Sequence, residues 1–137
     1  MKTLLAFTMV LAGLAVASLS AHHGLGATYD SAKRETMTGV VTELAWRNPH
    51  VSLFVDVKDA NGTVTNWALE SANVSTLSRG GWTRTKFRPG TPVTVVVNPA
   101  RSGAPVALLL TVALPDGTKL RGIGGGAGVT EEERRIQ

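Results

Sequence analysis

The chain has 137 residues, which is enough for one compact domain but not for two once a leader is subtracted. It contains no cysteine, and this excludes disulfides, thiolate metal sites and a cysteine nucleophile. Its 14 lysines and arginines against 10 aspartates and glutamates give a formal net charge of +4, a mild excess whose distribution matters more than its size.

Residues 1–21 have the pattern of a cleavable signal peptide. Lys2 supplies a positive start, residues 4–16 form an apolar run, and small residues follow. Because the run is shorter than the roughly 20 residues that a membrane-spanning helix needs, we expect the leader to be removed and not to act as an anchor. Cleavage after Ser20 and cleavage after Ala21 both remain open. The protein is therefore predicted to be exported.

Alternation of apolar and polar residues predicts half-buried strands beyond the leader. The first strand is expected over residues 37–46, with Val40, Leu44 and Trp46 on one face. Gly39 within it permits a sharp bend or a bulge. Trp46 has apolar neighbours, so we assign it to the core.

The second and third strands are expected over residues 51–58 and 63–70. Between them, Asn61 and Gly62 favour the positive φ angles of a tight turn, so the two strands are predicted to form a hairpin. Trp67 falls among apolar residues and is assigned to the core. The second strand directs four side chains to the core side, namely Val51, Leu53, Val55 and Val57.

After the hairpin the pattern changes to that of a short helix over residues 71–79, stopped by Gly80 and Gly81. A fourth strand is expected over residues 92–97 and a fifth over residues 106–114. A short continuation of the sheet is expected at Lys119 and Leu120.

Three strands, one short helix and two further strands is the order of elements in an OB-like barrel, which closes on itself and leaves few free edges. We therefore predict an all-β fold with small α content over residues 22–121, a five-stranded OB-like barrel with one short helix between strands 3 and 4. An open β-sandwich and a differently wound barrel are the alternatives. Residues 122–137 are glycine-rich and then charged, and we expect a flexible tail.

The three histidines occupy positions that suit metal binding. His22 and His23 lie at or beside the predicted mature terminus, where an α-amino nitrogen and an imidazole form a chelate that favours copper. His50 opens the second strand on the face away from the core. With Glu70 or Asp56 as a further ligand or orienting carboxylate, the three imidazoles would bind copper or zinc. The competing interpretation is an unstructured terminus and a His50 that hydrogen-bonds the backbone of a turn.

A second candidate site is a basic segment, because no acidic residue occurs between Glu70 and Asp116. Trp82 follows two glycines in this segment and is expected to be partly exposed. An anionic protein, a lipid headgroup or a polysaccharide would suit it, whereas nucleic acid is not expected outside the cytoplasm. A solvated surface is the alternative. The candidate partner-binding residues are Trp82, Arg84, Arg88 and Arg101.

No catalytic set is recognisable in the sequence. There is no Gly-x-Ser-x-Gly motif and no phosphate-binding loop, and the glycine-rich run lacks the strand-to-helix context of a dinucleotide site. We expect a non-catalytic binding or accessory protein, a monomer or a weak oligomer, with copper or zinc as the one cofactor hypothesis.

A series of short motifs resembles, in order, an exported Gram-negative family of unknown function. The resemblance implies export to the periplasm and one small β-domain, and it supplies no activity. Members look as if their mature chain begins His-His-Ser, whereas Gly24 replaces the serine here, which weakens any role for a hydroxyl there. The motifs that carry the resemblance best are His22-His23-Gly24, Trp46-Arg47-Asn48-Pro49-His50 and Asn98-Pro99-Ala100-Arg101.

Overall fold

The computed structural model describes residues 27–123 of the chain. The predictions for the signal peptide, for His22 and His23 and for residues 124–137 lie outside this part. The elements run in chain order as β1 (Glu35–Ala45), β2 (Ser52–Lys58), β3 (Val64–Glu70), α3 (Val74–Arg79), β4 (Pro92–Pro99), β5 (Val106–Ala113) and β6 (Lys119–Arg121).

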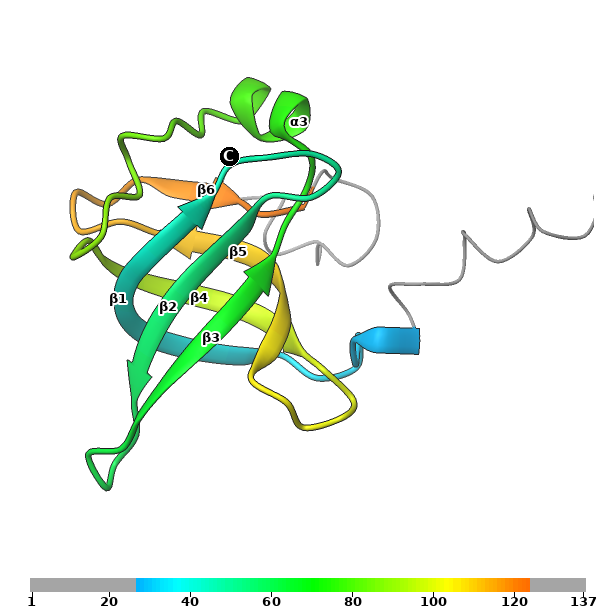
Figure 1. The fold of residues 1–137 in the computed structure, drawn as a ribbon, viewed down its shortest axis with the longest axis vertical. Coiled ribbons are helices and arrows are strands. Elements are labelled where there is room, and N and C mark those ends of the chain that lie inside the picture. Colours follow the sequence, from blue (N-terminus) through cyan, green and yellow to red (C-terminus); the bar gives the residue numbers. More distant parts are fainter. Residues whose placement is uncertain (1–26, 124–137) are drawn as a thin grey trace, which may run out of the picture.

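Five strands close into a barrel in the order β3-β2-β1-β4-β5 (Figure 1). Neighbouring strands are antiparallel except at the closure, where β3 and β5 run parallel. The short strand β6 extends the sheet beyond β5. With α3 between β3 and β4, this is the predicted OB-like barrel, and the prediction of the fold is confirmed.

Strand β1 is long enough to pair with β2 along its second half and with β4 along its first. Gly39 lies where the two pairings meet, opposite Val57 and Val93. A Cβ atom at Gly39 would lie 2.3 Å from the carbonyl oxygen of Asp56, so only glycine permits this close approach. The glycine at this position thus has a steric cause.

The predicted core face of the first strand is wrong in its first half. Val40 is 42% exposed, whereas Val41 is buried. A register shift between Val41 and Glu43 inserts one extra residue into β1, and this moves the inward-facing positions by one. Beyond the shift, Leu44 and Trp46 pack against the core as expected.

The hairpin of β2 and β3 follows the predicted pattern. Val51, Leu53 and Val55 have no exposed surface, and Trp67 packs against the core from the opposing strand. In the turn, Asp59 Oδ1 accepts hydrogen bonds from the backbone N–H groups of Asn61 and Thr63. Only glycines among the described residues have positive φ, so Gly62 alone, at +88°, and not Asn61, adopts the left-handed conformation.

Helix α3 ends before Gly80, as the sequence indicated, but it begins at Val74 and not at Ser71. The side chain of Asn73 accepts a hydrogen bond from the N–H of Thr76 at 2.9 Å, which caps the first turn. Gly80 donates to the carbonyl of Thr76, and Gly81 follows with a φ of +87°.

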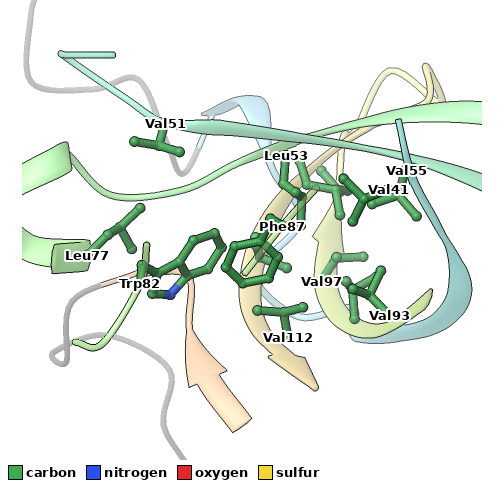
Figure 2. Packing of buried hydrophobic residues seen from close by; sticks show 14 residues of the cluster. Val41, Val51, Leu53, Val55, Leu77, Trp82, Phe87, Val93, Val97 and Val112 are labelled. Atoms are coloured by element: carbon green, nitrogen blue, oxygen red, sulfur yellow. The ribbon is translucent and has the colours of Figure 1, made fainter. Parts of the chain in front are cut away.

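The loop after α3 closes one end of the barrel and corrects a second expectation. Trp82 is 2% exposed, and its ring lies 4.2 Å from that of Phe87 (Figure 2). Its indole N–H donates to the carbonyl of Arg121 at 2.8 Å. Burying a ring with this much apolar surface stabilises the fold more than leaving it in water beside charged residues would. Trp82 is therefore a core residue and not an exposed platform.

The packed part of the chain runs past the predicted start of the tail. Gly122 is buried, its N–H donates to the carbonyl of Leu110, and its carbonyl accepts from the N–H of Ala72. A Cβ atom at Gly122 would lie 2.4 Å from the carbonyl oxygen of Leu109.

None of the helices within residues 27–123 has the length and hydropathy to cross a bilayer.

Candidate functional site

His50 lies in the connection between β1 and β2, directly before a fixed stretch of backbone. Its neighbour Val51 donates to the carbonyl of Ala72 and accepts from the N–H of Ser71. On the other side of His50, the peptide bond between Asn48 and Pro49 is cis. The His50 side chain is 45% exposed, so its imidazole is accessible from solvent, as the strand pattern predicted.

The Nδ1 atom of His50 contacts Oε1 of Glu70, the last residue of β3. The two residues are neighbours because β2 and β3 pair in a register that sets Ser52 opposite Glu70. A carboxylate only accepts hydrogen bonds, so the Nδ1 atom facing it must carry the hydrogen. The neutral ring then has its free lone pair on Nε2, which is the atom able to bind an electrophile.

The other oxygen of Glu70 is held by a residue from the beginning of the described chain. The hydroxyl of Tyr29 donates to Oε2 of Glu70 at 2.5 Å, and the Tyr29 residue is 3% exposed. Burial, the hydrogen bond and the negative charge of Glu70 all raise the pKa of the Tyr29 phenol above its ordinary value. We call Tyr29, His50 and Glu70 the His50 cluster.

Backbone pairing fixes Tyr29 in this position. Tyr29 forms an antiparallel bridge with Ala100, in the connection between β4 and β5. The N–H of Asp30 donates to the carbonyl of Pro99 at 2.9 Å, and that of Arg101 donates to the carbonyl of Thr28 at 3.0 Å. The Asp30 carboxylate also lies 3.6 Å from the guanidinium of Arg101. The first described residues are therefore tied to the barrel beside Glu70.

Within residues 27–123, no group of three or more histidine, cysteine, aspartate or glutamate side chains converges as a metal site would. By itself, the His50 cluster thus offers a metal ion one imidazole nitrogen. Both oxygens of its carboxylate, Glu70, already contact Tyr29 and His50. Asp56, the other carboxylate considered from the sequence, is six residues further along β2, about 20 Å away at the usual strand rise, and accepts from Asn66. Of the carboxylates considered, only Glu70 is beside His50.

The residues of the predicted basic segment do not form one surface. Arg84 and Arg88 are exposed in the chain before β4, whereas Arg101 follows β4 at its opposite end and pairs with Asp30. The seven-residue rise along β4 alone separates these ends by about 23 Å. Although residues 71–115 contain no acidic residue, the fold brings the carboxylate of Asp116 close enough to the basic segment for its charge to interact with that of Lys86. The Asp116 carboxyl has its pKa lowered by hydrogen bonds from Thr118, with a smaller contribution from the charge of Lys86.

Sequence reasoning named His50 and Glu70 but did not single out Tyr29 as a site residue. Tyr29 is the only tyrosine of the chain and stands in a polar stretch before β1. A lone aromatic residue in such a stretch signals that something packs over it, although it does not name the partner.

Fold and site together define a small closed β-barrel of the OB type, with a histidine–carboxylate pair beside the end of β3. A family model matches residues 9–109, and the chain belongs to that family, described as a family of unknown function (DUF6152). This agrees with the resemblance to an uncharacterised family. Neither the curated proteins nor the solved structures include a significant match.

Proposed function

We propose that this protein is an exported, periplasmic and non-catalytic binding protein that captures copper or zinc at the His50 cluster. The observation that carries the proposal is the contact of His50 Nδ1 with the Glu70 carboxylate. Histidines that bind a metal through one ring nitrogen nearly always donate the other N–H to a carboxylate, a carbonyl or water. His50 has this arrangement, with Nε2 as the prospective ligand atom.

His22 and His23 are the proposed further ligands. Tyr29 follows His23 by six positions. An extended chain of that length spans at most about 20 Å, so the covalent connection allows the two terminal imidazoles to meet His50. If cleavage occurs after Ala21, the new α-amino nitrogen joins them, and nitrogen donors of this kind favour copper over other first-row divalent ions.

The place of the cluster in the fold supports a binding role. In OB-type barrels, the connections between β1 and β2 and between β4 and β5 border the usual ligand surface. Here the first connection carries His50, and the second holds Tyr29 through its bridge with Ala100. This is an analogy between folds, and it supports the location of a site without naming its ligand.

Titration calorimetry of the mature protein with Cu(II) and with Zn(II) tests the proposal. We expect one ion per chain and, for His50→Ala, a loss of affinity greater than the roughly 10- to 100-fold that removal of an orienting partner costs. The matched control is Asp116→Asn, an exposed carboxylate beyond the far end of β5, which should bind as the wild type does. Equal affinities of the wild type and His50→Ala would contradict the proposal.

Export is tested by the intact mass of the protein recovered from the periplasm. The expected masses lack residues 1–20 or residues 1–21, and the same measurement without denaturation reports any bound metal. A periplasmic protein that retains the first 21 residues would contradict the proposed processing and remove the α-amino ligand.

A further inference from the structure

The two oxygens of Glu70 are occupied by side chains that reach it from different parts of the chain. Oε2 accepts the Tyr29 hydroxyl, and Oε1 faces Nδ1 of His50. The Glu70 side chain is 27% exposed and ends a strand, so without Tyr29 its carboxylate would be free to turn toward water. The position of one oxygen therefore decides where the other one points.

We propose that Tyr29 is the positioning residue of this site. By holding Glu70, it fixes the tautomer and the orientation of the His50 ring, so that Nε2 is the nitrogen presented to a metal ion. The part of this inference that concerns metal rests on the proposed function, whereas the part that concerns the tautomer does not.

The chemistry of the buried hydroxyl favours this role. A tyrosine hydroxyl in the interior needs a hydrogen-bond partner, and the partner that Tyr29 has is the carboxylate of Glu70. A hydrogen bond to an ionised carboxylate is about twice as strong as one between neutral groups. Breaking this hydrogen bond would cost free energy, because the buried hydroxyl would lose its carboxylate partner. Tyr29 therefore limits the Glu70 side chain to one rotamer.

Tyr29 is itself well fixed, which a positioning residue requires. Its bridge with Ala100 and the ion pair of Asp30 with Arg101 hold the backbone on both sides of its side chain. The carbonyl of Lys33 accepts a further hydrogen bond from the side chain of Asn98 at 2.5 Å. The contacts that hold residues 28–33 beside the barrel are thus the same contacts that place the Tyr29 hydroxyl.

The test is a Tyr29→Phe variant, which keeps the ring in the core and removes only the hydroxyl. Nitrogen-15 NMR of the imidazoles, recorded on metal-free mature protein, reads the tautomer directly, and His50→Ala identifies the His50 signals. We expect neutral His50 to carry its hydrogen on Nδ1 in the wild type and to become a mixture of both tautomers in Tyr29→Phe. Asp116→Asn should leave these signals unchanged.

Metal affinity gives the second readout. Tyr29→Phe should weaken Cu(II) or Zn(II) binding by about tenfold, the lower end of the range for loss of an outer partner. Glu70→Gln should weaken it at least as much and should release the same tautomer preference. If Tyr29→Phe fails to fold, Glu70→Gln still tests whether the Glu70 carboxylate fixes the His50 tautomer.

The two proposals fail in different ways. An unchanged His50 tautomer in Tyr29→Phe overturns the positioning role of Tyr29, even if Glu70→Gln changes the tautomer and metal binding depends on His50. A protein that binds neither metal ion, yet changes its His50 tautomer in Tyr29→Phe, overturns the proposed function and leaves the positioning role standing.

Discussion

The hydroxyl of Tyr29 donates a hydrogen bond to Glu70 across 41 positions of the chain. It joins the start of the described chain to the end of β3, next to the one histidine of the barrel. Because the contact is buried at the tyrosine and partly exposed at the glutamate, it affects both the stability of the fold and the chemistry of the His50 cluster.

The first prediction concerns the ionisation of Tyr29. Since burial, Glu70 hydrogen bonding and Glu70 charge raise its pKa, the phenol should ionise at higher pH in the folded protein than in denaturant, where about 10 is usual. Glu70→Gln should lower this pKa without restoring the ordinary value, because burial is the largest cause. The absorbance of the phenolate measures it without interference, as the chain has one tyrosine.

The same shift determines a pH dependence of stability. A group with a raised folded pKa stabilises the folded state fully below its unfolded pKa, and this contribution is lost as pH rises through the folded pKa. The free energy of unfolding should therefore fall above about pH 10. In the Tyr29→Phe variant, it should fall less steeply with pH. Identical phenol titrations in folded and denatured protein would contradict both expectations.

The second prediction concerns Trp82 as a core residue. Trp82→Ala should lower the free energy of unfolding by about 3–5 kcal/mol, because it leaves a cavity against Phe87. Trp82→Phe should cost about 1–2 kcal/mol, mainly from the lost hydrogen bond to Arg121. Urea unfolding measures both. A Trp82→Ala variant as stable as the wild type would show that the ring does not fill the barrel end.

The third prediction concerns Gly39. Gly39→Ala places a Cβ atom 2.3 Å from the Asp56 carbonyl oxygen, so β1 and β2 must separate locally at a cost of about 1–3 kcal/mol. Gly80→Ala is the matched control, since its nearest atom would lie 3.3 Å away and its φ of −81° suits alanine. In chemical denaturation, Gly39→Ala should have a clearly lower free energy of unfolding than Gly80→Ala. Equal stabilities of the two variants would refute the steric explanation.

The fourth prediction separates the metal proposal from the basic-surface alternative. The double variant Arg84→Glu with Arg88→Glu changes two exposed side chains that do not belong to the His50 cluster. We expect its stability to stay within about 0.5 kcal/mol of the wild type and its metal affinity to be unchanged. Sedimentation with phosphatidylglycerol vesicles should show no binding of the wild type. Vesicle binding that the double variant abolishes would favour the alternative.

The local pattern of the chain was enough to predict most of the barrel, for a physical reason. Successive side chains of a strand point to opposite faces, so the alternation over residues 51–58 identifies Val51, Leu53 and Val55 as core residues without any knowledge of their neighbours. Gly80 likewise ends α3 through hydrogen bonds to residues of the helix itself. Such features depend on short stretches of sequence.

The errors lie where contacts join distant stretches. The extra residue in β1 accompanies the curvature needed to pair with both β2 and β4, and alternation gives no sign of it at Val40 and Val41. Trp82 looked exposed beside glycines and arginines, but its ring is buried in the core cluster with residues of the barrel strands.

Sequence alone predicted the succession of strands and helix along the chain and the histidines and carboxylate worth considering, because those follow from residue type and local periodicity. It could not establish that Tyr29 meets Glu70, that Asp56 lies far from His50, or that β4 separates Arg88 from Arg101. Those relationships depend on the pairing of β3 with β5, which closes the sheet, and on the pairing of Tyr29 with Ala100. Both pairings join residues far apart in the sequence, so no short stretch of the chain predicts them.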